Sequence, residues 1–248
     1  MRGHRAIEAC PVLIFALSAF GQPAPDVAEV LQKVKTTYTD ISQYRLSATI
    51  TEEQVAPSGK KSVAAASIKV TVQKPNHLNW EVSSSDAALI TGIYVGEEVI
   101  VSDGTNVFWY LPKLRQYTRT PIGPLVTPMG TVAAFIDHIE DLLFDRFKHV
   151  ETGGAKLLRE EVVPVGGSPI PCYVVEMATQ FQKHFTWWID KRSNVVMREV
   201  YELKGPPGIK SLTRRTDFTV AQIGGPIDEQ SFVFIPPPGA RQVEARKR

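Results

Sequence analysis

Apolar and polar residues alternate along most of the chain, the pattern typical of β-strands that bury one face. The segment YRLSATI places Tyr44, Leu46, Ala48 and Ile50 on one face and polar residues on the other. SIKVTVQK and LNWEV repeat this pattern. We expect further strands in LITGIYV, EEVIVSD, NVFWYLP, LRQYTRT, LREEVVPV, PCYVVEMAT, KHFTWWID, NVVMREVYE and SLTRRTDFTVA.

Two segments change to the period of an amphipathic helix. In DVAEVLQKVKTTYTDI, Asp26 is the predicted N-cap of an apolar face that contains Val27, Val30, Leu31, Val34 and Tyr38. In TVAAFIDHIEDLLFDRF, one stripe holds Phe135, Ile136, Ile139, Leu142, Leu143 and Phe147. Thr127 and Pro128 precede this second segment and predict its start.

These elements follow one another without a linker or a repeat of fixed period, which favours a single domain. The predicted fold class is mainly β with α. We expect one curved antiparallel sheet, an incomplete β-barrel, covered by the N-terminal helix and by a central amphipathic lid helix. The domain is expected to span residues 22–248.

The first residues have the layout of a secretory signal peptide. A short basic start, MRGHR, precedes the apolar run ACPVLIFALSAF, and Ala19 and Gly21 are the small residues of a cleavage site. An uncut N-terminal anchor is the alternative. We therefore expect residues 1–21 to be removed between Gly21 and Gln22, and the mature protein to lie in the periplasm.

Composition narrows the class of protein. The net charge is +2 and charged residues make up 22%, which argues against nucleic acid as the main partner. Cys172 is the one cysteine left after the leader, so we expect it to be a small core residue. The basic residues Arg214, Arg215 and 246–248 are interpreted as solvated, with contact to anionic lipid as the alternative.

No catalytic, cofactor-binding or metal-binding residues are predicted. The chain lacks a Gly-x-Ser-x-Gly elbow, a glycine-rich phosphate loop and a Cys-x-x-Cys pair. On a helix, His138 pairs with Asp141 but lacks a second histidine four residues on. We therefore expect no enzymatic activity and no cofactor.

The run Phe108, Trp109, Tyr110 makes one strand apolar on both faces. Such a strand is covered on both sides or lines an apolar space. Ordinary core packing is one interpretation. The other is a hydrophobic cavity closed by the central helix and lined by Trp80, Val107, Trp109, Leu111, Phe135, Ile139, Leu142, Leu143, Phe185 and Trp187.

Four segments together resemble the periplasmic lipoprotein carrier family, LolA. They are KPNHLNWEV, VSDGTNVFWYLPKLRQYTRTPI, FTWWIDKRSNVVMREV and FVFIPPPGARQV, and the resemblance extends from about Val27 to Val243. It implies an incomplete barrel whose helices close a hydrophobic cavity for the acyl chains of lipoproteins. It also implies an inner-membrane donor and an outer-membrane acceptor, and we expect a monomer.

The sequence departs from the family at two places. The family has an arginine before Pro-Asn that holds the lid helix shut by hydrogen bonds to its backbone, and Lys74 stands at that position. Lysine lacks the planar fork of arginine, so the same closure is not expected. The segment 152–170 is also longer than in the typical carrier.

The first functional hypothesis is a periplasmic carrier of acylated lipoprotein or lipid cargo, acting as a chaperone in transport to the outer membrane without catalysis. The alternative is a lipid- or peptide-sensing regulatory module of envelope stress signalling. A secreted hydrolase is disfavoured by the missing catalytic constellation.

Overall fold

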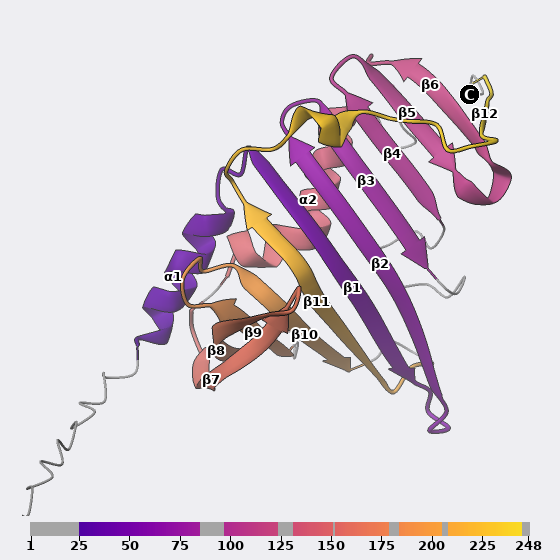
Figure 1. The fold of residues 1–248 in the computed structure, drawn as a ribbon. Helices are drawn as coiled ribbons and strands as arrows, with labels where there is room; N and C mark the ends of the chain where they lie inside the picture. Colours follow the sequence, from indigo (N-terminus) through magenta and orange to yellow (C-terminus); the bar gives the residue numbers. More distant parts are fainter. Residues whose placement is uncertain are drawn as a thin grey trace, which may run out of the picture.

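The described residues form one large sheet with two helices on one of its faces (Figure 1). The computed structural model describes residues 25–84, 97–123, 131–150, 152–178, 184–204 and 208–244. Its long strands are β1 (Gln43–Val55), β2 (Lys61–Gln73), β3 (His77–Ser84), β7 (Lys156–Val165), β8 (Ser168–Ala178) and β11 (Ser211–Ile223). The shorter ones are β4 (Glu98–Asp103), β5 (Asn106–Leu111), β6 (Gln116–Pro121), β9 (His184–Asp190), β10 (Val196–Lys204) and β12 (Arg241–Gln242).

The strand order confirms the predicted fold class. It runs β12-β6-β5-β4-β3-β2-β1-β11-β10-β9-β8-β7, so the sheet has two edges and does not close into a barrel. Neighbouring strands are antiparallel, except for the short parallel pair of β12 and β6. The expected strand LITGIYV lies in residues 85–96, outside the described part of the chain.

Register decides which aromatic residues share a face. Trp80 pairs with Ile100, and Ile100 pairs with Trp109. Cross-strand partners lie on the same face of a sheet. These side chains therefore lie together on the face that carries the helices, while Phe108 and Tyr110 lie on the opposite face.

Helix α1 (Val27–Tyr38) begins where the sequence predicted. The Asp26 carboxylate accepts a hydrogen bond from the Ala28 N–H at 3.0 Å, which satisfies a free donor of the first turn. Tyr38 ends the helix in the core: its hydroxyl accepts from the Val196 N–H at 3.1 Å. This bond ties α1 to strand β10.

Helix α2 (Val132–Lys148) begins later than predicted. Its N-cap is Thr131, whose hydroxyl accepts from the Ala134 N–H at 3.1 Å. The Thr127–Pro128 start was therefore wrong, and both residues lie outside the described ranges. Thr131 provides the same capping chemistry directly before the apolar stripe.

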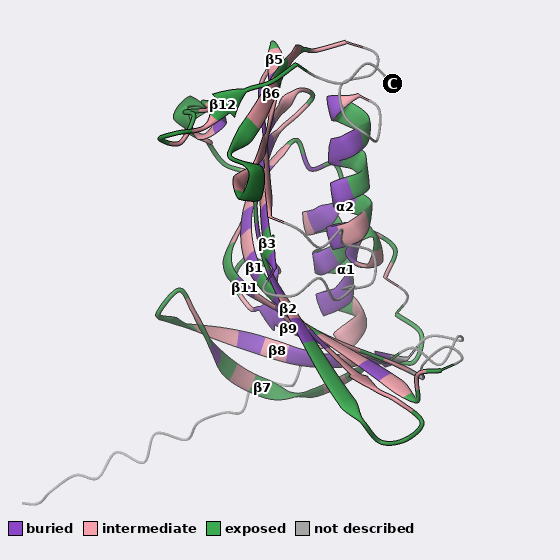
Figure 2. Ribbon diagram, turned by 90° about the vertical axis from the view of Figure 1, so that its right-hand side faces the viewer, coloured by how far each residue is buried: buried purple, intermediate pink, exposed green. Residues whose placement is uncertain are grey.

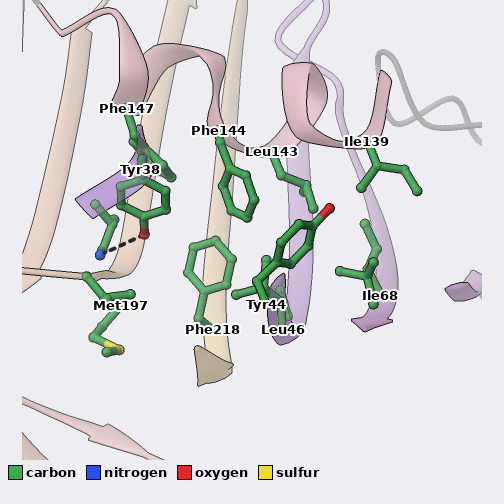
Figure 3. Packing of buried hydrophobic residues seen from close by; sticks show 14 of the residues in the cluster. Tyr38, Tyr44, Leu46, Ile68, Ile139, Leu143, Phe144, Phe147, Met197 and Phe218 are labelled. Atoms are coloured by element: carbon green, nitrogen blue, oxygen red, sulfur yellow. Dashed lines mark hydrogen bonds between the residues drawn. The ribbon is translucent and has the colours of Figure 1, made fainter. Parts of the chain in front are cut away.

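The apolar stripe of α2 lies directly on the sheet (Figure 3). Ile139 lies above Ile68, and Phe144 lies above Phe218. Phe147 packs against Tyr38 with ring centroids 4.7 Å apart. The stripe matches the prediction, except that Leu142 is half-buried and that Val132, Glu140 and Phe144 are buried with it.

The C-terminal strap, residues 226–244, crosses the face of the sheet opposite the helices (Figure 2). It contains the short helix η2 (Glu229–Phe232) and β12. Phe234 stacks on Phe108 at 5.0 Å, and Phe232 contacts His77 at 5.2 Å. The strap therefore covers the second apolar face of β5.

Cys172 is a free, fully buried cysteine of β8, as predicted. Among the described residues, neither helix is long and apolar enough to cross a lipid bilayer.

Candidate functional site

The predicted cavity residues follow α2 from one end to the other. Near its start, Phe135 packs edge-on against Trp80 at 6.1 Å. Near its end, Phe147 packs edge-on against Trp187 at 4.8 Å. Ile139 and Leu143 are buried between these ends. The structure therefore places the two aromatic groups at opposite ends of one continuous apolar contact.

Other predicted lining residues lie at the margins of this contact. Val107 is buried on β5, whereas Leu111 is half-buried opposite Gln116 at the end of that strand. Trp109 packs against the core but is itself half-buried. Phe185 stacks on Tyr201 at 5.0 Å.

Lys74 directly contacts the helix that covers the sheet. It follows β2 and places its Nζ atom 2.9 Å from Oε1 of Glu140 on α2. Lys148 Nζ lies 2.9 Å from the other carboxylate oxygen. The Glu140 side chain is 3% exposed and that of Lys74 is 33% exposed. A buried carboxylate on the helix thus receives one cation from the sheet and one from its own helix.

A second buried carboxylate holds the other end of α2. Glu199 of β10 forms an ion pair with Arg146 of α2, and it accepts a hydrogen bond from the Trp187 indole at 3.1 Å. Its side chain is 2% exposed. Arg146 also donates to the Leu142 carbonyl oxygen at 3.0 Å. The helix is therefore joined to the sheet by an ion pair near its middle and another near its end.

Glu98 adds a carboxyl group beside the two tryptophans of the sheet. The Trp80 indole donates to its Oε1 atom at 3.4 Å. Burial raises the pKa of Glu98, and the indole N–H groups of Trp80 and Trp109 offset part of that rise by stabilising the carboxylate. The apolar face of β3–β5 therefore contains a carboxyl group, that of Glu98, whose neutral form is favoured by burial.

Sequence reasoning missed the three carboxylates Glu98, Glu140 and Glu199. Glu140 had a visible signal, since it interrupts the apolar stripe of α2 between Ile139 and Leu143. A charged residue at such a position requires a partner. The partner itself could not be identified, because Lys74 is far away in the sequence.

The other polar residues singled out in the sequence do not come together in one site. His138 is exposed on α2, and the described residues contain no group of three or more histidine, cysteine or acidic side chains arranged to hold a metal ion. Arg214 pairs with Glu52 at 2.9 Å, and Arg215 pairs with Asp217. The described site therefore consists of apolar residues of the sheet that α2 covers, with ion pairs between the helix and the sheet.

Comparison with known proteins gives one family. Residues 27–141 match the family described as predicted periplasmic protein (DUF2092). The match covers somewhat less than half of the chain and includes both Lys74 and Glu140. The description agrees with the periplasmic location predicted from the leader, although the leader itself lies outside the described residues. No curated protein matches significantly.

Several solved structures are similar at low identity. LprF from Mycobacterium bovis is 11% identical over 89% of this chain and 100% of its own, with a TM-score of 0.48. The Pseudomonas aeruginosa MucA/MucB complex is 14% identical over 85% of this chain, with a TM-score of 0.39. There this chain spans only 62% of the matched chain's length.

A LolA superfamily protein from Nitrosomonas europaea is also similar. It is 12% identical over 85% of this chain and 99% of its own, with a TM-score of 0.25. None of these three likenesses is close enough to assign a function.

Proposed function

We propose that the protein is a periplasmic carrier that shields the acyl chains of lipoproteins or lipids between α2 and the sheet, without a catalytic step. One observation carries the proposal. Helix α2 covers the sheet with an apolar stripe, and in the described part of the chain the ion pairs Lys74–Glu140 and Arg146–Glu199 connect its polar groups to the sheet. A helix attached in this way can be displaced as a unit.

Displacement of α2 exposes apolar residues on both surfaces at once. On the sheet these are Tyr44, Leu46, Ile68 and Phe218, which lie beneath the helix (Figure 3). An acyl chain inserted there replaces the lost contacts, because each methylene kept from water contributes about 0.8 kcal/mol. The closed arrangement is then the empty state of the carrier.

The ion pairs suit reversible binding. Two charges brought together away from water regain little more than the free energy of their desolvation. Lys74–Glu140 and Arg146–Glu199 therefore fix the position of α2 without making its displacement prohibitive. Transfer from an inner-membrane donor to an outer-membrane acceptor requires such a balance.

The first experiment is native mass spectrometry of the mature protein purified from the periplasm. We expect non-covalent adducts whose masses correspond to molecules with two or three acyl chains. A clean apo mass, together with exclusion of apolar fluorescent probes, would contradict the carrier. The regulatory alternative, in which the residues between α2 and the sheet form only a hydrophobic core, would then be favoured.

A second experiment locks α2 to the sheet. Ile68→Cys and Ile139→Cys together place thiols on facing positions of β2 and α2 (Figure 3), and a short, cleavable thiol-to-thiol crosslinker added to the open state can span them. We expect the crosslinked variant to exclude apolar probes and the cleaved variant to regain them. Each single cysteine variant is the control, and Cys172 does not interfere because it is fully buried. Equal probe uptake in the crosslinked and cleaved forms would place the ligand elsewhere.

A further inference from the structure

One corner of the sheet carries exposed apolar and basic side chains together. It consists of the short helix η1 (Pro112–Leu114), Arg115 and the adjoining part of the C-terminal strap. Leu114 is 60% exposed and Ile235 is 78% exposed. Lys113, Arg115 and Arg241 of these segments are exposed as well. We call this set the basic corner.

Backbone contacts hold the basic corner in place. The Arg241 N–H donates to the Arg115 carbonyl oxygen at 2.9 Å, and the Val243 N–H donates to that of Tyr117 at 2.9 Å. A Cβ on Gly239 would lie 3.6 Å from the Arg115 guanidinium carbon, so the strap passes closely over that side chain. The end of the strap is therefore fixed beside Arg115 and Tyr117.

The cations of the basic corner differ from many others on the sheet. Lys61, Lys69 and Arg215 each form an ion pair with a carboxylate of the sheet. Within the described part of the chain, Lys113, Arg115 and Arg241 form none, and the nearest acidic residue along the strap is Glu244. The three cations of the corner are therefore free to pair with an external anion.

We propose that the basic corner docks the protein on the surface of an anionic lipid bilayer. Anionic headgroups attract the cations, and Leu114 and Ile235 insert at the boundary between headgroups and acyl chains. Leu114 is flanked by Lys113 and Arg115 in the sequence, and an exposed apolar residue between cations suits a lipid surface better than a protein interface.

This docking does not rest on the proposed carrier function. The strap lies on the face of the sheet opposite α2 (Figure 2), so the corner stays accessible whether or not α2 moves. Cargo binding and membrane docking can therefore fail separately. For a carrier, such docking would hold the protein at a membrane while the helix-bearing face stays free.

The test is co-flotation of the mature protein with vesicles at low and high salt. We expect binding to mixed phosphatidylcholine and phosphatidylglycerol, weaker binding at high salt, and little binding to phosphatidylcholine alone. The variant with Lys113→Gln and Arg241→Gln should bind the mixed vesicles about 30-fold more weakly, since each cation near an anionic surface contributes about 1 kcal/mol. Leu114→Ser with Ile235→Ser should weaken the binding that remains at high salt.

A matched control removes the same charge elsewhere. Lys60 and Lys156 are also exposed, and Lys60→Gln with Lys156→Gln should leave vesicle binding nearly unchanged. Equal loss in the two double variants would overturn the proposal, because net charge alone would then explain binding. The proposal would also be overturned if removal of residues 245–248 abolished vesicle binding while the Lys113→Gln, Arg241→Gln variant still bound. It would likewise be overturned if the unaltered protein did not bind the mixed vesicles.

Discussion

Lys74 Nζ lies 2.9 Å from the buried Glu140 carboxylate and so links the end of β2 to the middle of α2. The resemblance to the carriers placed a helix-closing residue at this position. The structure brings Lys74 to the helix by a different contact, an ion pair with a side chain. A point charge without a planar fork suits a single carboxylate partner.

Lys74→Leu should loosen α2. It leaves the buried carboxylate of Glu140 with Lys148 alone, and we expect a loss of about 1–3 kcal/mol in the free energy of unfolding. Hydrogen exchange should rise first in α2. Lys74→Arg, which keeps the charge, is the control. Unchanged exchange and unchanged cargo retention in Lys74→Leu would show that the pair has no role in holding the helix.

Glu98→Gln should change how stability depends on pH. Burial raises the pKa of Glu98 above its ordinary value of 4.5, so the folded state binds this proton more tightly than the unfolded state. Its stabilising contribution is complete below pH 4.5 and is lost as the pH rises through the raised pKa. Glutamine removes that loss. Urea unfolding over a pH series should therefore show that the free energy of unfolding falls less steeply with rising pH in the variant than in the unaltered protein. The same fall in both proteins would refute the raised pKa of Glu98.

Phe234→Ala should free the C-terminal strap. Phe234 stacks on Phe108 and also contacts Tyr110 and Tyr117, so its removal should cost about 2–3 kcal/mol. The uncovered aromatic face should then bind a hydrophobic dye. Ile235→Ala is the matched control, because that neighbour is 78% exposed and should change stability by less than about 0.5 kcal/mol. Equal unfolding midpoints for the two variants would mean that the strap adds nothing to the fold.

Cys172 should be inert in the folded protein. Burial, with a smaller contribution from the nearby Asp190 charge, raises the pKa of its thiol to about 12. The reactive thiolate is therefore scarce near neutral pH, and the side chain is out of reach of solvent. A chromogenic disulfide reagent should label it only at the rate at which the protein unfolds. Rapid labelling in buffer without denaturant would contradict the buried position in β8.

The sequence by itself determined the fold class and much of the element order. Alternation assigned Tyr44, Leu46 and Ile50 to one buried face, and the helical period assigned Ile136, Ile139 and Leu143 to one stripe. These features depend on the local geometry of the backbone, in which side chains repeat every two residues in a strand and about every 3.6 in a helix. Capping chemistry likewise located the start of α1 at Asp26.

Only the tertiary structure decided what covers each face. Trp109 lies on the helix-bearing face, whereas Phe108 lies beneath a strap formed by residues more than a hundred positions later in the chain. Glu140 found its partner in Lys74 in the same way. Local periodicity states which residues share a face. The segment that packs on that face is chosen by contacts between parts of the chain that are distant in sequence, and no local pattern encodes them.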